Sequence, residues 1–190
     1  KNTGAATENS VESTEGAAES TGTSVESTEA GNAGTQQENG DVASALQSAK
    51  KAVTDALGDD YWPDSEIPEE MLNETYGVSA DLYDAYLGEC PMISVNVDTL
   101  LIIHAKDGKV EDVENALNAY RDSLVNDTMQ YPMNLGKIQA SRVERIGDYV
   151  CFVQLGADIS SVEEQGDEAV ITYCQEQNEL ALEAIRQTLE

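Results

Sequence analysis

Histidine and cysteine are scarce in this 190-residue chain, which narrows the chemistry it can perform. His104 is the single histidine, so zinc sites built from several histidines are excluded, and any catalytic triad would have to use it. The three cysteines, Cys90, Cys151 and Cys174, lack the CxxC spacing of zinc and redox sites, and an odd number cannot all pair within one chain. No metal site and no cofactor is expected.

Basic residues are also few, with 10 Lys and Arg against 37 Asp and Glu and a net charge of −27. Nucleic acid is an unexpected partner, because binding to a phosphate backbone depends largely on Lys and Arg. Anionic membrane surfaces are disfavoured for the same reason, whereas cationic partners are favoured. No stretch approaches the roughly 18 consecutive apolar residues that a spanning helix needs.

Large apolar residues are almost absent from residues 1–40, which consist mainly of Ser, Thr, Gly, Ala, Glu, Asn and Gln. The segment repeats itself once, at residues 10–15 and 24–29, in the manner of a low-complexity expansion. Because such side chains cannot recover the entropy lost on ordering, we expect a disordered linker. Residues 41–190 are long enough to bury a real core and are expected to form one domain.

Helical spacing of apolar residues predicts several helices in this domain. The first follows a cap at Asp41 and ends at Gly58, and Pro68 begins a second one that ends at Gly77. The remaining expected helices are a short one from Ser79 that carries Leu82, Tyr83, Tyr86 and Leu87, a long one over 110–128, and a C-terminal one that follows a capping box of Ser161 and Glu164.

Alternating or continuous apolar runs predict the strands. Residues 93–97 alternate, residues 100–103 form a continuous run typical of a central strand, and residues 141–146 and 149–155 flank the turn dipeptide Gly147-Asp148. We therefore predict an α+β fold in which a mainly antiparallel sheet of about four strands packs against helices.

The order of short motifs along the chain resembles a family of bacterial lipoproteins catalogued as domain of unknown function 4358. The motifs span about residues 60–160 and comprise Ile67-Pro68-Glu69-Glu70-Met71, Tyr76-Gly77-Val78, Asp107-Gly108, a helix with Arg121, Tyr131-Pro132 and Gly147-Asp148-Tyr149-Val150. The resemblance implies a secreted lipoprotein of Gram-positive anaerobes, in which residues 1–40 link the domain to the cell membrane. The signal peptide and lipid-bearing cysteine are then expected before Lys1. The family has no assigned activity, so it supplies no catalytic residues.

Two groups of side chains are candidates for ligand binding. Tyrosine combines an apolar ring with a polar tip, so four tyrosines could line a groove for a sugar or peptide, although helix packing explains them equally well. Clustered basic residues could hold a carboxylate or phosphate, although ion pairing with the many acids is favoured. The candidates are Tyr76, Tyr83, Tyr86 and Tyr131 in the first group, and Arg121, Arg142, Arg145 and Lys137 in the second.

Other chemistry-bearing residues are better explained structurally. His104 falls on one face of a predicted strand, and a loop containing Asp59, Asp60, Asp64 and Glu66 lacks the spacing of a calcium-binding loop. Cys151 and Cys174 lie in apolar patterns that indicate packing, which leaves Cys90 as the candidate for a reactive or intermolecularly paired thiol. The usual catalytic motifs are absent.

Three functions remain open at this point. The favoured one is a non-enzymatic extracellular domain that binds a peptide, glycan or protein. The second is a carboxylate-dependent hydrolase or transferase, which would need two carboxyl groups in one cleft, with or without His104. The third is a structural domain that assembles with itself or with a membrane complex through an apolar patch.

Overall fold

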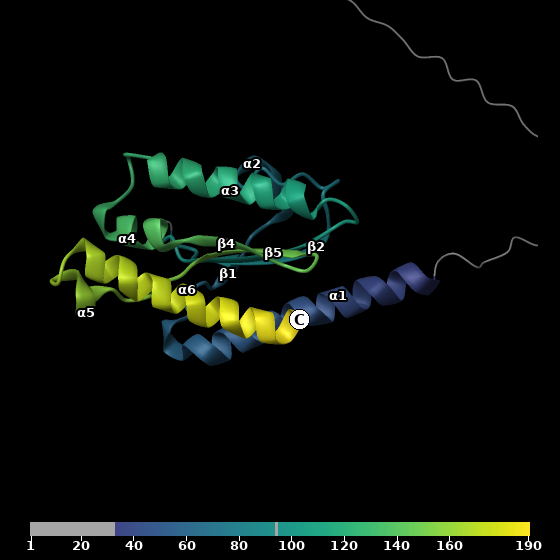
Figure 1. Ribbon diagram of the computed structural model, residues 1–190, viewed down its shortest axis with the longest axis horizontal. Coiled ribbons are helices and arrows are strands. Elements are labelled where there is room, and N and C mark those ends of the chain that lie inside the picture. The colour runs from purple at the N-terminus through teal and green to yellow at the C-terminus, as the bar shows by residue number, and fades with distance from the viewer. Residues whose placement is uncertain (1–32, 94) are drawn as a thin grey trace, which may run out of the picture. The chain divides into compact units, whose positions relative to one another are not determined.

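A five-stranded antiparallel sheet lies at the centre of the structure (Figure 1). The structure, a computed structural model, describes residues 33–190 apart from residue 94, with side chains from Gly40 onward. The sheet order is β1-β2-β3-β5-β4. The strands are β1 (Ser65–Glu66), β2 (Tyr83–Cys90), β3 (Thr99–Ala105), β4 (Arg142–Ile146) and β5 (Tyr149–Gln154). The predicted α+β class and antiparallel sheet are confirmed, with one strand more than expected.

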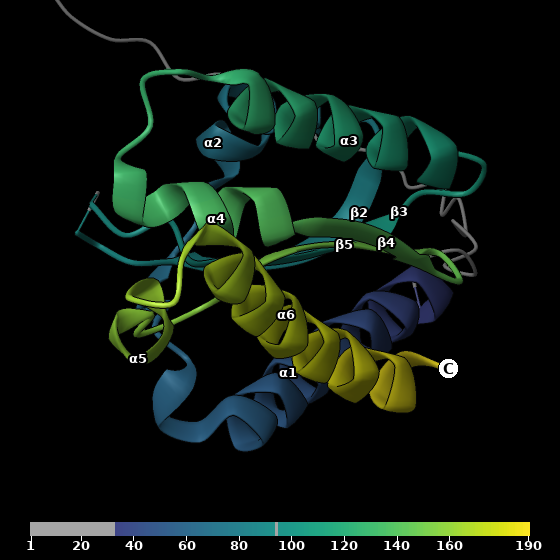
Figure 2. The same ribbon diagram turned by 60° about the vertical axis from the view of Figure 1, so that its left-hand side comes forward.

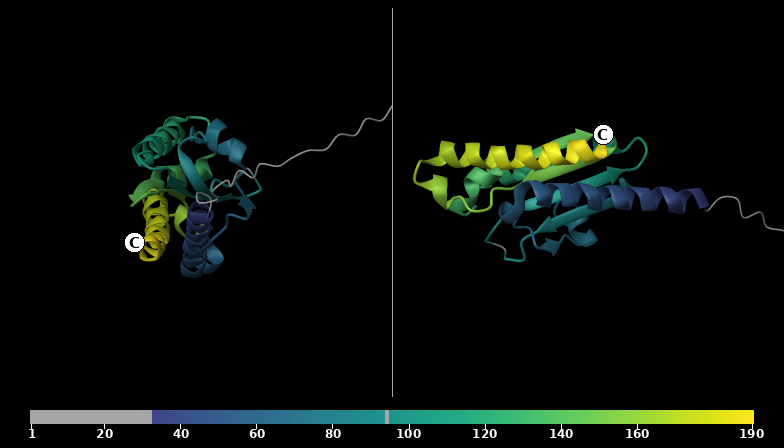
Figure 3. Two further views of the ribbon diagram at one scale, coloured as in Figure 1. Left: turned by 90° about the vertical axis from the view of Figure 1, so that its right-hand side faces the viewer. Right: turned by 90° about the horizontal axis from the view of Figure 1, so that it is seen from below.

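Helices cover both faces of this sheet. On one face, α1 (Ala33–Leu57) and α6 (Asp167–Leu189) run side by side in opposite directions (Figure 3). On the other face lie α2 (Glu69–Glu74) and α3 (Val110–Asn126). The helices α4 (Pro132–Ala140) and α5 (Ser160–Glu163) both contact α6 and lie at one end of the sheet (Figure 2).

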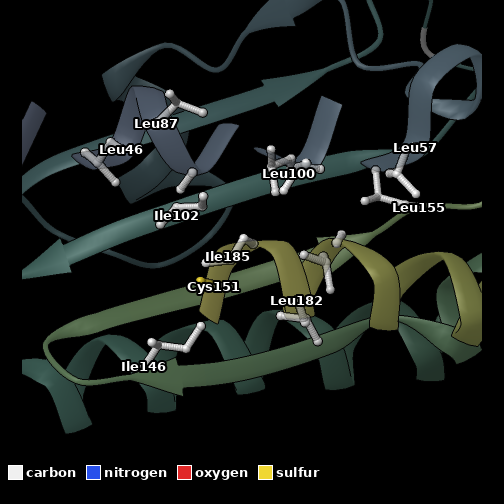
Figure 4. Close-up of a cluster of buried hydrophobic side chains, with 14 residues drawn as sticks. Leu46, Leu57, Leu87, Leu100, Ile102, Ile146, Cys151, Leu155, Leu182 and Ile185 are labelled. Carbon is white, nitrogen blue, oxygen red and sulfur yellow. The ribbon is translucent and has the colours of Figure 1, made fainter. Parts of the chain in front are cut away.

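The central strand β3 explains why two cores form. Its residues Leu100, Leu101, Ile102 and Ile103 are all fully buried, and alternate side chains point to opposite faces. Leu100 and Ile102 pack with side chains of α1 and α6 (Figure 4), whereas Leu101 and Ile103 pack under α2 and α3. The prediction of a central strand from a continuous apolar run is thus confirmed.

The predicted hairpin is also present. Gly147 has a φ of +58°, which an L side chain adopts only with strain, and Ile146 pairs with Tyr149 across the two-residue turn. β5 lies between β3 and β4, so its apolar residues are covered on both faces, as the sequence indicated.

The helix predicted from Ser79 is wrong, because Tyr83, Tyr86 and Leu87 belong to strand β2. The register shifts at Asp84, which has no partner on β3. This bulge brings Tyr83 and Tyr86, three residues apart, into the same core under α2 and α3. A strand with this irregularity therefore shows the apolar spacing that is typical of a helix.

The strand predicted at residues 93–97 is also wrong, because residue 93 and residues 95–97 lie in the loop between β2 and β3. Ile93 and Val95 are 69% and 48% exposed, so their alternation does not reflect a buried face. Hydrogen bonds from side chains of α4 and β5 hold this loop, and pairing with another strand does not. Asn134 Nδ2 donates to the carbonyl of Val95 (3.0 Å), and Gln154 Nε2 donates to that of Val97 (2.6 Å).

The two terminal helices differ from the prediction at their starts. α1 begins at Ala33, eight residues before the expected cap at Asp41, so it overlaps the end of the predicted linker. Residues 1–32 and the repeat within them lie outside the described residues. At the other end, the expected single helix is split into α5 and α6, and Asp158 Oδ1 accepts the amide hydrogen of Ser160 (2.9 Å) in place of the predicted capping box. Within the described range, no helix combines the length and apolar character needed to cross a bilayer.

Candidate binding site

Exposed apolar side chains gather around two adjoining cavities at the end of the sheet that carries α4 and α5. The first cavity has a volume of about 250 Å³, and Trp62, Val95, Met133 and Ile159 lie in its wall. The second has a volume of about 460 Å³, and its wall includes Tyr131, Met133, Leu135, Ile159 and Ile171. Because Met133, Ile159 and Glu163 belong to both walls, we treat the two cavities as one site and call it the apolar groove.

The clustering of exposed apolar residues at this site is specific. Among side chains in the described part of the chain, ten large apolar ones are exposed. Five of them lie in the walls of the groove, and three more belong to the same three short segments. These eight are Trp62 after α1, Met92, Ile93 and Val95 in the β2–β3 loop, and Met129, Tyr131, Met133 and Leu135 around the start of α4. The other two, Val125 and Leu180, lie on α3 and α6.

Close packing of α4 against α6 shapes the second cavity. A Cβ atom at Gly136 would lie 2.5 Å from Cγ1 of Val170, far inside the normal contact distance. Only glycine therefore allows the two helices to approach this closely. Met133 and Leu135 are exposed on α4, and Ile171 of α6 lies in the same wall.

A buried ion pair lies at the floor of the first cavity. The side chains of Lys137 and Asp98 are 5% and 0% exposed, and Nζ of Lys137 lies 2.6 Å from Oδ1 of Asp98. Nζ also donates to the carbonyl of Ala157 (2.7 Å) and lies 3.4 Å from Oδ1 of Asn96. These three acceptors match the three hydrogens of an ammonium group, so Lys137 has no hydrogen left to offer a ligand.

The second oxygen of Asp98 fixes the opposite wall of the cavity. Oδ2 accepts the amide hydrogen of Ala157 (2.9 Å), and Ala157 has a φ of +41°, the single non-glycine residue with positive φ in the described chain. Such a conformation costs on the order of 1 to 3 kcal/mol and persists where its surroundings enforce it. The Lys137–Asp98 pair thus fixes the backbone of Ala157. The next three residues in the chain, Asp158, Ile159 and Ser160, lie in the wall of the first cavity.

Burial and the ion pair act in opposite directions on Asp98. Burial raises the pKa of this carboxyl above its ordinary value, and the charge and hydrogen bonds of Lys137 partly oppose the shift. Trp62 adds a further contact, because the Nζ of Lys137 lies 5.3 Å from the centre of its ring. The ammonium group is therefore held between one carboxylate and one aromatic face.

The charge around the rim of the groove is negative. Asp158, Glu163 and Asp167 are exposed and lie in the walls of the two cavities, and Lys137 is the one basic residue in either wall. Hydrogen bonds from the backbone and side chain of Ser160 hold the pKa of Asp158 below its ordinary value, so this carboxylate stays ionised at neutral pH. The groove therefore combines largely apolar walls with an acidic rim.

Comparison with known proteins identifies a family but no function. A model of a domain of unknown function, DUF4358, matches residues 57–155, which is more than half of the chain. The chain belongs to the DUF4358 family. Neither the curated proteins nor the solved structures contain a match to it. The matched segment includes Trp62, Val95, Asp98, Met133 and Lys137, whereas Ala157 and the α5 wall follow its end.

The four candidate tyrosines of this DUF4358 chain do not share one groove. Tyr76 is 3% exposed, and its ring packs 4.5 Å from that of Tyr120, centre to centre, where burial raises its pKa. Tyr83 is also buried, and its hydroxyl lies 3.1 Å from Oε1 of Glu69, with a pKa raised to about 12 mainly by burial. Both are therefore core residues.

Tyr86 and Tyr131 line two different cavities. Tyr86 donates its hydroxyl hydrogen to the carbonyl of Ile67 (2.9 Å) and borders a polar cavity of about 300 Å³ that also contains Lys50 and Glu89. Tyr131 is 58% exposed and belongs to the apolar groove. Of the four tyrosines, Tyr131 alone lies in the site described above.

The structure brings Arg121 and Arg142 together but occupies their hydrogen-bond donors. Both line a depression of about 430 Å³ at the β4 edge of the sheet. Arg121 donates to the carbonyls of Ser141 (2.7 Å) and Gln139 (3.3 Å), and Arg142 pairs with Glu144 (2.8 Å) and Glu179. Lys137 lies elsewhere, and Arg145 donates to the carbonyl of Gly147. This geometry supports ion pairing and not an anion site.

The remaining candidates show no catalytic arrangement. Nδ1 of His104 is buried without a hydrogen-bond partner, 3.6 Å from Oδ2 of Asp84, and His104 is in the wall of none of the cavities named above. Asp64 Oδ1 accepts the amide hydrogen of Met92 (2.8 Å). Among the residues that the structure describes, no group of three or more His, Cys, Asp and Glu is placed to hold a metal ion.

All three cysteines are free thiols. Cys151 and Cys174 are fully buried, and burial raises the pKa of both, that of Cys174 to about 11. Cys90 is partly exposed, and its pKa is raised by burial and by the charge of Asp64. A raised pKa lowers the thiolate fraction, so none of the three is activated as a nucleophile.

Sequence reasoning missed the residues that form the groove. Trp62, Met133 and Asp98 carry no recognisable motif in the sequence. The available signal was the run Met129, Tyr131, Met133, Leu135, which places four large apolar residues at alternate positions around Pro132. Such a run beside a helix-initiating proline fits neither the buried face of a helix nor that of a strand. It therefore indicates that these apolar side chains are exposed.

Proposed function

We propose that this DUF4358 domain is a binding module that holds a protein or peptide in the apolar groove. The observation that carries the proposal is that five of the ten exposed large apolar side chains lie in the walls of this site, with three more in the same chain segments. Large contiguous apolar patches are rare on monomeric proteins and mark sites of interaction. Apolar cavities with a few fixed polar groups are also the usual form of a binding site.

The groove is supported as a preformed site by the rigidity of its walls. The Lys137–Asp98 pair, the amide of Ala157 and the hydrogen bond from Asn134 to Val95 connect α4, the β2–β3 loop and the segment before α5. A surface that is fixed before binding loses less conformational entropy when a ligand arrives. A rigid apolar surface is therefore better explained by ligand binding than by the chance exposure of apolar side chains.

The same proposal places the module outside the cell, anchored to the membrane through an N-terminal lipid. It is supported by the polar composition of residues 1–40 and by the resemblance to secreted lipoproteins. Protease added to intact cells should then cut within residues 1–40 and release the folded domain. Protection of the protein until the cells are lysed would contradict this location.

Selection of displayed random peptides tests the binding role directly. Trp62 is the single tryptophan of the chain and lies in the groove, so its emission reports on occupancy by tryptophan-free peptides. We expect selected peptides to shift this emission to shorter wavelength. The double variant Val95→Thr/Met133→Gln, which keeps side-chain size but removes apolar surface, should weaken their binding by about tenfold or more.

Val125→Thr/Leu180→Gln is the matched control, because Val125 and Leu180 are similarly exposed but lie away from the groove. It should bind the selected peptides like the wild type. Failure to select any peptide, equal binding by the two double variants, or binding of cell-wall glycan fragments alone would overturn the proposal. Concentration-dependent dimers that Val95→Thr/Met133→Gln abolishes would favour the self-assembly hypothesis instead.

A further inference from the structure

We infer that the ligand of the apolar groove is a protein segment in which apolar side chains alternate with, or are flanked by, Lys and Arg. This inference rests on the proposed binding function and adds the chemistry of the partner. It is drawn from three features of the site: a floor without free cationic donors, two adjoining cavities with shared walls, and a rim of carboxylates.

The floor excludes an anionic ligand. Lys137 is the one base in the walls, and its ammonium hydrogens already meet Asp98, Ala157 and Asn96. A ligand carboxylate or phosphate would have to displace Asp98, which would leave a buried carboxylate without its partner. Breaking a buried ion pair in this way is strongly unfavourable. An apolar group that fills the space beside Met133 and Ile159 meets no such penalty.

The paired cavities favour a chain segment over a single small molecule. The two cavities have volumes of about 250 and 460 Å³, and Met133 and Ile159 belong to the walls of both. Two side chains of one segment can enter the two cavities while its backbone crosses the shared wall. In one common mode of peptide recognition, an extended segment places alternate side chains into separate pockets.

The rim selects the charge of the flanking residues. Glu163 belongs to both cavities, with Asp158 beside the first and Asp167 beside the second. The chain as a whole carries a net charge of −27, so the field around the groove also attracts cations. Charges at the rim of an interface act mainly on association rate and on the choice of partner. A basic segment is therefore favoured and an acidic one is repelled.

The same charges argue against a membrane as the occupant. Anionic lipid headgroups attract Lys and Arg side chains, and they repel exposed Asp and Glu side chains near the membrane surface. The groove has exposed Asp158, Glu163 and Asp167 where a membrane-binding surface would carry bases. A protein segment with its own positive charges satisfies both the rim and the floor.

Three tryptophan-free synthetic peptides of about twelve residues test the inference, with the emission of Trp62 as the readout. One alternates Leu and Lys, one alternates Leu and Glu, and one alternates Ser and Lys. We expect the Leu–Lys peptide to bind about tenfold or more tightly than either of the others. Its affinity should fall several-fold between about 50 mM and about 300 mM NaCl, because salt screens the rim charges.

The variant Glu163→Gln should weaken the Leu–Lys peptide by a factor of about two to five, since Glu163 borders both cavities. Glu111→Gln, which removes the same charge at an exposed position on α3, is the control and should leave the affinity unchanged. Equal effects of the two variants would show that only net charge matters, and would overturn the role of the rim.

The outcomes separate this inference from the proposed function. If the Leu–Glu peptide binds as tightly as Leu–Lys, the groove still binds peptides but the inferred charge preference is wrong. If Ser–Lys binds as tightly, attraction to the acidic surface explains the result, and the apolar cavities play no part. If none of the three peptides binds while selected peptides do, the inferred chemistry of the partner is wrong and the proposed function stands. Binding to zwitterionic phosphatidylcholine vesicles in place of the peptides would make the occupant a membrane, which also contradicts the inference.

Discussion

The ammonium nitrogen of Lys137 lies 2.6 Å from Oδ1 of Asp98, and both side chains are almost fully buried under the apolar groove. The two residues are 39 positions apart in the chain. Lys137 belongs to α4, and Asp98 directly precedes β3. Through the backbone of Ala157, the same pair also holds the segment that leads to α5. One ion pair therefore connects three elements that wall the groove.

Loss of Lys137 should destabilise the domain strongly. Lys137→Met leaves the carboxylate of Asp98 buried without its partner, so we expect a loss of about 3 to 5 kcal/mol in the free energy of unfolding. The double variant Lys137→Met/Asp98→Asn removes the unpaired charge and should lose less than the sum of the two single variants by about 0.5 to 3 kcal/mol. Urea denaturation followed by circular dichroism measures both. Strictly additive losses would contradict an ion pair.

The close approach of α4 and α6 predicts an unusual glycine effect. Alanine normally stabilises a helix by up to about 1 kcal/mol over glycine. Gly136→Ala should instead destabilise the protein by about 1 to 3 kcal/mol, because the new methyl group meets Val170. Val170→Ala combined with Gly136→Ala should recover part of the loss, as measured by thermal or urea denaturation. A stabilising Gly136→Ala would show that the helices are farther apart.

The thiols should differ in their reaction with a disulfide reagent such as DTNB. In the native protein, Cys90 alone is expected to react at neutral pH, and slowly, because its pKa is raised. Cys151 and Cys174 are fully buried, so they should react only after unfolding in urea. The rate at Cys90 should rise with pH as the thiolate fraction grows. Three fast thiols in the native state would contradict the packing of β5 and α6.

Arg186 should control the acid behaviour of Glu179. A hydrogen bond from Arg186, aided by Arg142, holds the pKa of Glu179 below its ordinary value. Because the folded pKa is lower than the unfolded one, this interaction stabilises the protein above the unfolded pKa and is lost as the pH falls toward the folded pKa. Arg186→Gln should raise the pKa of Glu179, as measured by carboxyl ¹³C chemical shifts during titration.

Urea denaturation between about pH 6 and pH 3 gives the matching stability test. The advantage of the wild type over Arg186→Gln should shrink as the pH falls through this window. Lys51→Gln is the control, because Lys51 and Asp55 form an exposed pair within α1. It should change stability little at any pH. A constant difference between wild type and Arg186→Gln would mean that the arginine stabilises by packing alone.

Local sequence patterns predicted the parts of the fold in which burial follows a regular period. The run from Leu100 to Ile103 identified the central strand, and Gly147 identified the hairpin turn. The helix period failed at β2 because the bulge at Asp84 changes which side chains share a face. The strand period failed at Ile93 and Val95, where alternation occurs in an exposed loop. Neither irregularity has a local signal strong enough to be recognised.

The candidate site was less predictable because it depends on contacts between distant residues. Lys137 was grouped with the arginines by charge, yet its partner Asp98 lies in another part of the sequence. Of the tyrosines predicted to line one groove, Tyr131 is exposed and borders the apolar groove, whereas Tyr76 is a core residue that packs against Tyr120. Residue type predicted which side chains could bind a ligand, but only the fold shows which of them share a cavity.

A chemical-shift map of the ¹⁵N-labelled protein with the Leu–Lys peptide tests the central claim most directly. If the apolar groove is the binding surface, the largest shifts should occur at the amides of Val95, Met133 and Ile159, with little change along α1 or β4. Shifts centred on the depression at Arg121 and Arg142, or spread evenly over the acidic surface, would contradict it.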